Sequence, residues 1–159
     1  MNKSSHKILL PLLVMSAAVT DLASAVCLDP KTWISGYKVP FQVEFNSSIA
    51  IVIGEVISEQ KVYETSEDLE YYYLIFTVRT EQVLKGNPLK TFKLREELDS
   101  GRYSLSVGER HLLFITKWKW KVRGADYVIN SCGNSSRLPE GDQVVAEVQR
   151  ALHQSPHAP

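Results

Sequence analysis

Hydrophobic positions in this chain repeat mainly with the two-residue period of a β-strand. Residues 49–57 read Ile-Ala-Ile-Val-Ile-Gly-Glu-Val-Ile, and this β-branched run predicts a central strand with two apolar faces. In residues 71–84, Leu74, Phe76 and Val78 recur at every second position. They predict a second strand whose apolar face carries the even-numbered residues.

Three shorter apolar stretches predict further strands. Residues 91–95 place Phe92 and Leu94 on one face of a third strand, and residues 110–116 are apolar on both faces of a fourth. Residues 125–130 predict the fifth. The connections between these stretches are long and polar.

Glycine and proline positions mark the expected bends. Gly54 lies inside the first strand and predicts a bulge or a sharp bend. Residues 85–88 read Lys-Gly-Asn-Pro, a typical turn sequence, and residues 29–32 read Asp-Pro-Lys-Thr, which predicts a turn near the start. Residues 28–45 are otherwise irregular, and we expect them to lie over the core.

The hydrophobic period changes to that of a helix near the C-terminus. Val144, Val145, Val148 and Leu152 recur at helical spacing, after Pro139 and two acidic residues that suit a first helical turn. We therefore predict a mostly β domain at 26–138, specifically a five-stranded Greek-key OB-fold barrel. A helix at 139–153 packs on the barrel, and a disordered tail follows at 154–159.

Residues 1–25 are predicted to be a secretory signal peptide. Lys3 and Lys7 precede an apolar run at 8–19, and Ala23-Ser24-Ala25 fits the small-x-small cleavage pattern. The alternative, a membrane anchor, would need roughly 20 apolar residues, and the run at 8–19 is shorter than that. Lipidation of Cys27 would need a small residue before it, and that position is Val26. We expect export to the periplasm or the extracellular space.

Charge and cysteine content narrow the function classes. Lysine plus arginine and aspartate plus glutamate number 18 each, which argues against a nucleic-acid partner. The two cysteines of an exported chain predict one disulfide, Cys27–Cys132, worth on the order of 4–5 kcal/mol. No histidine–cysteine cluster supports a metal site, and the sequence predicts no cofactor.

Several segments together resemble the netrin-like domain of the tissue inhibitors of metalloproteinases, especially its single-domain bacterial relatives. The resemblance spans roughly residues 27 to 138 and implies an OB-fold barrel with the N-terminus tied across it. The matching features are the N-terminal cysteine, the strand at 49–56, Val83-Leu84-Lys85-Gly86, Ser106-Val107-Gly108-Glu109-Arg110-His111-Leu112-Leu113 and Ser131-Cys132-Gly133-Asn134.

The chain departs from this family at one disulfide. The inhibitors begin with Cys-x-Cys, and their first cysteine binds the target's catalytic zinc through its amino group and carbonyl. The matching position here is Ala25, and the position of that cysteine's usual partner is Arg102. The second pair, Cys27 and Cys132, is kept. The resemblance therefore implies the scaffold without the zinc-chelating residue.

The remaining polar residues do not form a catalytic pattern. A Ser-His-Asp arrangement needs converging groups and an oxyanion hole, and no serine lies in a nucleophile-elbow context. We expect the histidines to be surface or strand-edge residues and the acidic pairs to lie in solvated turns. These residues are His111, His153, His157, Glu67-Asp68, Glu96-Glu97 and Glu140/Asp142.

Residues 117–123 form the most unusual run, Lys-Trp-Lys-Trp-Lys-Val-Arg. Alternation places Trp118 and Trp120 on one face, with Lys117 and Lys119 on the other. Such a ribbon could bind glycan or an anionic membrane surface. Alternatively, the tryptophans cover the barrel end while the lysines keep a strand edge soluble.

The sequence thus predicts a monomeric, non-enzymatic, exported protein-binding module. We expect it to meet another exported protein, with a protease as one candidate, through an N-terminal ridge that contains Val26 and Cys27. It would be an inhibitor or an inhibitor-derived scaffold. The alternative is a glycan- or surface-binding module that uses Lys117, Trp118, Lys119 and Trp120.

Overall fold

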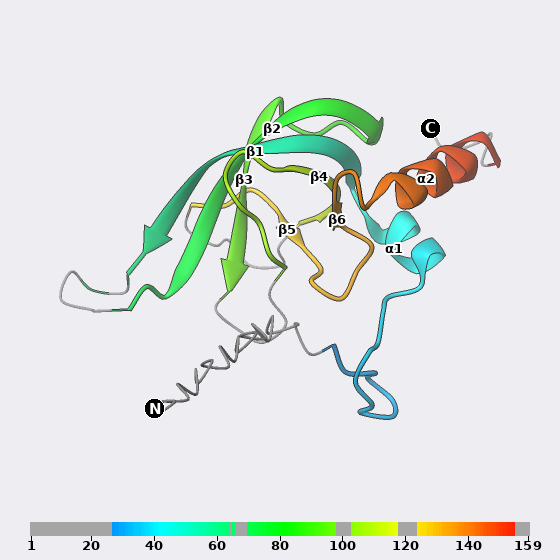
Figure 1. Cartoon of the computed structure of the whole chain (residues 1–159), viewed down its shortest axis with the longest axis horizontal. Coiled ribbons are helices and arrows are strands. Elements are labelled where there is room, and N and C mark those ends of the chain that lie inside the picture. Colours follow the sequence, from blue (N-terminus) through cyan, green and yellow to red (C-terminus); the bar gives the residue numbers. More distant parts are fainter. Residues whose placement is uncertain (1–26, 64, 66–69, 98–102, 118–123, 155–159) are drawn as a thin grey trace, which may run out of the picture.

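The protein is mostly β, with a C-terminal helix, as the sequence predicts (Figure 1). The computed structural model describes residues 27–63, 65, 70–97, 103–117 and 124–154. The elements are α1 (Phe41–Ser47), β1 (Ala50–Val62), β2 (Tyr73–Lys85), β3 (Thr91–Glu97), β4 (Arg110–Thr116), β5 (Val128–Ile129), β6 (Ser136–Arg137) and α2 (Asp142–Gln154).

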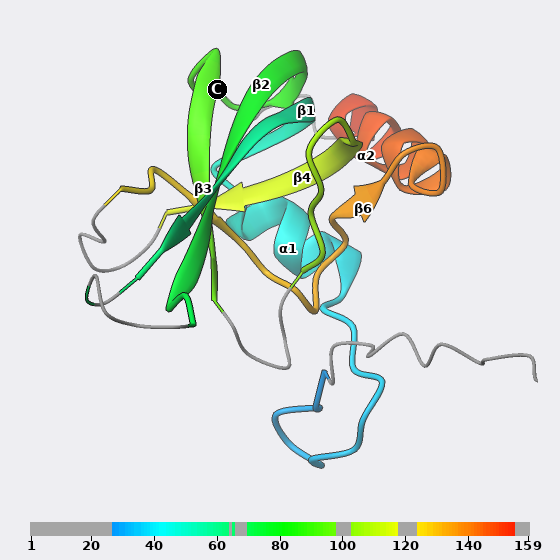
Figure 2. The ribbon, with the colours of Figure 1, turned by 60° about the vertical axis from the view of Figure 1, so that its left-hand side comes forward.

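The strands form one curled antiparallel sheet in the order β3-β2-β1-β4-β5, and β6 also pairs with β4. The two ends of this order meet, because Leu94 of β3 and Tyr127 form a parallel bridge. The amides of Asp126 and Tyr127 both donate to the Lys93 carbonyl, at 3.0 and 3.2 Å. Figures 1 and 2 show the resulting half-barrel. The fifth strand is shorter than the predicted 125–130.

Gly54 lies at a bend in β1, as predicted. The register between β1 and β2 shifts at Ile53/Gly54, and a Cβ at position 54 would lie 2.7 Å from Val78 Cγ1. Only glycine lets the strands approach this closely, and the register shift is a β-bulge that sharpens the curl.

Two apolar clusters lie on the two sides of the sheet. One is enclosed by the curl and contains the even-numbered face of β2, with Phe92 and Leu94 of β3. The other lies between the sheet and the two helices, where Phe114 of β4 and Val148 of α2 are buried. Strands β1 and β4 contribute to both clusters, which explains why their sequences are apolar on both faces.

The irregular segment predicted at 28–45 in fact ends in a helix, α1. Phe41 stacks on Phe45 with ring centroids 5.6 Å apart and meets the edge of Phe114 at 6.1 Å. At the C-terminus of α1, Lys85 Nζ donates to the carbonyls of Phe45 and Ser48. Such a short helix is marginal alone, so these tertiary contacts must stabilise it, and the local sequence could not show them.

The C-terminal helix begins at Asp142, three residues later than predicted. Pro139 therefore lies before the helix, in a turn closed by the Gly141 amide and the Arg137 carbonyl. Val144, Val145 and Leu152 pack on the sheet as their spacing predicts. The tail at 155–159 lies outside the described residues. Neither α1 nor α2 has the length and apolar character needed to cross a bilayer.

Candidate functional site

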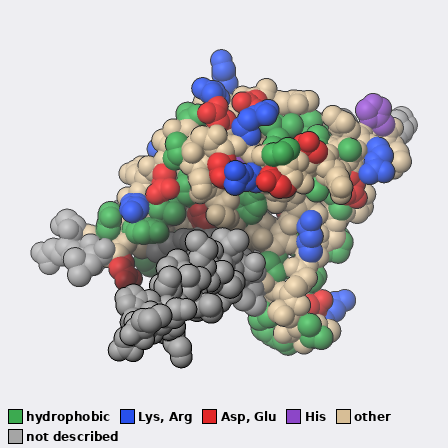
Figure 3. All heavy atoms as spheres, in the orientation of Figure 1, with side chains coloured by type: hydrophobic (Ala, Val, Ile, Leu, Met, Phe, Trp, Pro, Cys, Tyr) green, Lys and Arg blue, Asp and Glu red, His purple; other side chains and the backbone are tan. Residues whose placement is uncertain are grey.

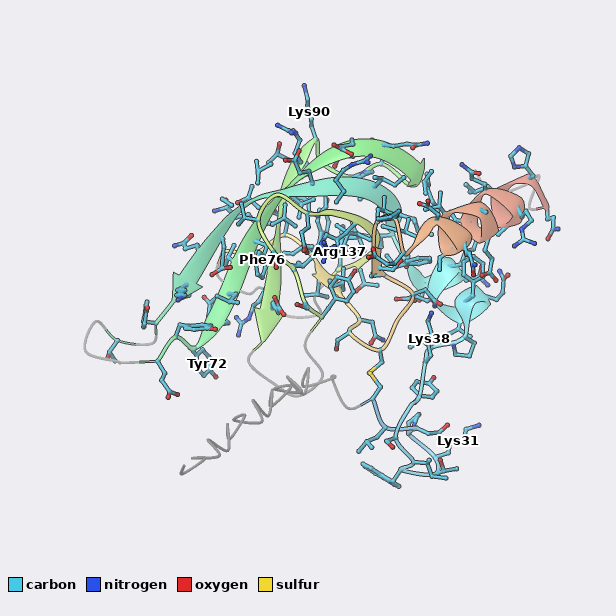
Figure 4. The ribbon with its side chains drawn as sticks, in the orientation of Figure 1. Lys31, Lys38, Tyr72, Phe76, Lys90 and Arg137 are labelled. Atoms are coloured by element: carbon cyan, nitrogen blue, oxygen red, sulfur yellow. A yellow bond between two sulfur atoms is a disulfide. The ribbon has the colours of Figure 1, made fainter. Side chains whose placement is uncertain are left out.

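The predicted disulfide joins the start of the described chain to the turn before β6. The sulfur atoms of Cys27 and Cys132 are 2.04 Å apart, across a sequence separation of 105. The Val39 amide donates to the Cys132 carbonyl at 2.9 Å, which adds a second link between the two segments. Disulfides persist in oxidising compartments, so the bond is consistent with the predicted export. The N-terminal ridge consists of Cys27, Val39 and residues 132–134, together with Val26, which lies outside the described residues. Figure 4 shows its disulfide as a yellow bond.

Residues 27–37 form a small hairpin beyond this ridge. Leu28 and Ser35 pair as an antiparallel bridge, and the Tyr37 amide donates to the Cys27 carbonyl at 3.0 Å. The turn predicted at 29–32 is present. Asp29 Oδ1 accepts the amides of Lys31 and Thr32 at 2.7 and 2.9 Å. These bonds favour the carboxylate and lower the pKa of Asp29.

The hairpin tip is apolar and exposed, which corrects the expectation that this segment lies over the core. The side chains of Trp33 and Ile34 are 73% and 66% exposed, and Leu28 is 43% exposed. Trp33 has φ of 60°, a left-handed conformation that is rare outside glycine. The Trp33 amide donates to the Asp29 carbonyl at 2.8 Å, which holds this conformation in place.

A buried carboxyl group, Glu44 of α1, holds the ridge against the barrel. Glu44 Oε2 accepts both the backbone amide and the Nδ2 group of Asn134, the latter at 2.7 Å. Asn134 Nδ2 also donates to the Val39 carbonyl at 3.0 Å. A Cβ at Gly133 would lie 2.0 Å from Glu44 Oε1, so a side chain there would displace the Glu44 carboxyl from its place beside Asn134. Burial is the largest influence on Glu44 and raises its pKa.

A second polar cluster surrounds His111 of β4, which we expected at the surface. That expectation is wrong, because His111 is fully buried. The Tyr103 hydroxyl lies 3.0 Å from His111 Nδ1, and His111 Nε2 lies 3.3 Å from Glu109 Oε2. Burial raises the pKa of Tyr103, so its hydroxyl stays protonated. An ionised Glu109 can only accept a hydrogen bond, which favours the neutral His111 tautomer with the proton on Nε2. In that tautomer Nδ1 accepts from the Tyr103 hydroxyl.

Acidification should destabilise the fold through His111. Burial is the largest influence on His111 and lowers its pKa, while Glu109 acts in the opposite direction. Arg137 lowers the pKa and Glu140 raises it, both more weakly. The His111 side chain therefore stays neutral in the folded state, whereas in the unfolded state it binds a proton below about pH 6.5. We expect stability to fall as the pH drops from 7.5 to 5.5, by at most about 1.4 kcal/mol per unit. Urea unfolding at both pH values measures this change.

The matched variants for this measurement are His111→Gln and His153→Gln. His153 is exposed near the end of α2, so His153→Gln is the control for replacing a histidine outside the core. His111→Gln should reduce the pH dependence, since it removes the titrating group. An H111Q protein with the same pH dependence as wild type would contradict the assignment.

The other predicted acid and base positions are divided between surface and core. Glu140 and Asp142 are exposed, as expected. Glu96 lies in β3 and is buried, so the expectation of a solvated turn there is wrong. His157, Glu67 and Asp68 lie outside the described residues. Within the described ranges, no three histidine, cysteine or acidic residues gather as a metal-binding group.

The predicted tryptophan ribbon is described only at its first residue. Lys117 follows β4 and is exposed. Trp118, Lys119 and Trp120 lie outside the described residues, as do Val26 of the ridge, the signal peptide and Arg102. Among the candidate residues that the structure describes, only Cys27 and Cys132 are brought together.

Sequence reasoning missed the hairpin tip and Glu44. A signal for the tip was present, because Trp33 and Ile34 stand between the predicted Asp29 turn and the Ser35-Gly36 pair. Glu44 lies between Val43 and Phe45, an apolar setting that is unusual for a solvated carboxylate. Its partner Asn134 is 90 residues away, and local pattern cannot reveal such a contact.

No protein-family model and no curated protein matches this chain. The functional argument therefore starts from the geometry of the ridge and the hairpin.

Proposed function

We propose that this chain is an exported, non-enzymatic binding module that meets another exported protein through the N-terminal ridge. The observation that carries the proposal is the way the ridge is held. The Cys27–Cys132 disulfide and the Glu44–Asn134 contacts fix the start of the described chain on the barrel. A partner would meet a preformed surface, and preorganisation reduces the entropy lost on binding.

The scaffold in this proposal is a Greek-key OB-fold barrel of the netrin-like type. The strand order β3-β2-β1-β4-β5, with β3 and the segment before β5 bridged at Leu94 and Tyr127, supports a barrel that is nearly closed. The Cys27–Cys132 pairing is the one that the family resemblance implies.

A protease is one candidate partner, with binding that does not involve zinc chelation. Ala25 and Arg102 replace the cysteine pair that would present a chelating N-terminus. Inhibition would then depend on shape and surface contacts at the ridge. The His111 cluster supports a structural role, since His111 is buried in the sheet and its polar contacts are a tyrosine hydroxyl and a carboxylate, Tyr103 and Glu109.

The test is capture of exported proteins by the processed protein, immobilised in its oxidised form. Intact mass of that protein reports the mature N-terminus and the disulfide, the latter as a loss of two hydrogens. Each retained protein is then purified and titrated by calorimetry, with wild type and with a form lacking Val26. We expect saturable binding that weakens when Val26 is removed. Retention of no saturable partner would overturn the proposal.

A further inference from the structure

The hairpin tip projects away from the rest of the protein (Figures 1 and 2). The space-filling view shows hydrophobic side chains gathered at its far end (Figure 3). The exposed apolar residues of this hairpin are Leu28, next to its base, and Trp33 and Ile34 at its tip. Apolar side chains gathered on a convex surface need an explanation, because proteins usually bury them or use them for binding.

A disulfide and several hydrogen bonds hold the tip in this exposed position. Its base is closed by the disulfide and by the Tyr37–Cys27 hydrogen bond, and its turn by the two amide bonds to Asp29 Oδ1. The left-handed φ of Trp33 is a strained conformation that its surroundings maintain. Insertion of the tip into another phase would therefore require little further ordering.

The charges at the two ends of the hairpin suit an anionic surface. Lys31 is exposed on the hairpin (Figure 4). Lys38 is exposed in the irregular segment that leads to α1. Asp29 is the one acidic residue in residues 27–37, and its Oδ1 accepts two backbone amides. Lysine side chains near an apolar insertion can extend their ammonium groups to lipid phosphates.

We propose that this tip docks the domain on an anionic lipid bilayer, with Trp33 and Ile34 in the interfacial region, Lys31 at the phosphates and Lys38 attracted to the anionic surface from the hairpin base. The surface area that the tip could bury favours lipid over protein as its binding partner. An indole side chain buries at most ~250 Å², and three side chains fall short of the roughly 800 Å² per partner of a stable protein interface. Tryptophan is also the side chain that membrane interfaces favour.

The experiment is flotation of the exported, processed protein with vesicles of phosphatidylcholine, with and without phosphatidylglycerol. We expect binding to the anionic vesicles, and a partition coefficient at least tenfold lower for Trp33→Ala/Ile34→Ala, from the apolar burial lost. Lys31→Gln/Lys38→Gln should lower it by about fivefold per lysine. Leu89→Ala, which changes another exposed apolar residue, should leave it unchanged.

A second measurement locates the indole directly. The chain has three tryptophans, so in a Trp118→Phe/Trp120→Phe background the emission comes from Trp33 alone. Brominated lipids should then quench it. No binding to anionic vesicles, equal binding by the Trp33→Ala/Ile34→Ala variant, or unquenched Trp33 would each overturn the proposal. Loss of captured protein partners by that variant, with no vesicle binding, would assign the tip to protein instead. The vesicle results are independent of the proposed function, because the vesicles contain no protein.

Discussion

Replacing Cys27 and Cys132 together by serine should lower the free energy of unfolding by about 4–5 kcal/mol. The disulfide closes a loop with a sequence separation of 105, and without it the unfolded chain gains the corresponding entropy. Domains are typically stable by about 5–15 kcal/mol, so the variant should be close to unfolding at physiological temperature. Urea denaturation of the oxidised protein and the variant measures the difference.

The reduced wild-type protein is the matched control, because it opens the same loop without changing a side chain into another residue type. We expect it to unfold at the same urea concentration as the double variant. A loss below about 1 kcal/mol in both would mean that the closed loop contributes little. Stability would then come mainly from the two apolar clusters on the sheet.

Replacing Glu44 by alanine should lower the free energy of unfolding by about 3 kcal/mol, the second largest effect we expect. Glu44 Oε2 accepts two donors of Asn134, and the variant would leave them buried without that acceptor. An unsatisfied buried donor costs about 1–3 kcal/mol. The Asn134–Val39 hydrogen bond remains and should limit the loss. Chemical unfolding at pH 7 measures the change, with exposed Glu59→Ala as the control, expected within about 0.5 kcal/mol.

A Glu44→Gln variant tests the ionisation of the same group. Burial raises the pKa of Glu44 above its usual 4.5, so the part of its stabilisation that depends on protonation is greatest below that pH and is lost as the pH rises through the folded-state value. The hydrogen bonds that Oε2 accepts from Asn134 remain at pH 7. Glutamine stays neutral throughout. The deficit of Glu44→Gln relative to wild type should therefore shrink as the pH rises above 4.5. A deficit that grows with pH would contradict a raised pKa.

The strands were predictable because their information is local. The period-two face of Leu74, Phe76 and Val78 and the two-faced run of β4 both appear in the structure as buried residues. Helix α1 was not predictable, since a helix of seven residues depends on contacts from β2 and β4. The pairing of the strands within the sheet also could not be predicted from local sequence patterns.

The site was predictable only where chemistry limited the choices. Two cysteines allow one intramolecular pairing, and the structure contains it. His111 and Glu96 were misplaced because polar residues can be buried when other elements supply partners. For His111 these partners are Tyr103 and Glu109, which precede β4. The exposed tip was missed because hydrophobicity alone predicts burial for tryptophan and isoleucine.

The disulfide also determines how a pulling force at the hairpin would travel through the molecule. Hydrogen bonds at a chain terminus can open one after another, like a zipper, under a small tension. Here the hairpin has two covalent routes into the body, through residues 38–40 to α1 and through Cys27 to Cys132. Tension at the tip is therefore divided between two separate segments of the fold. If this hairpin attaches the domain to a surface, two covalent connections transmit the force between them.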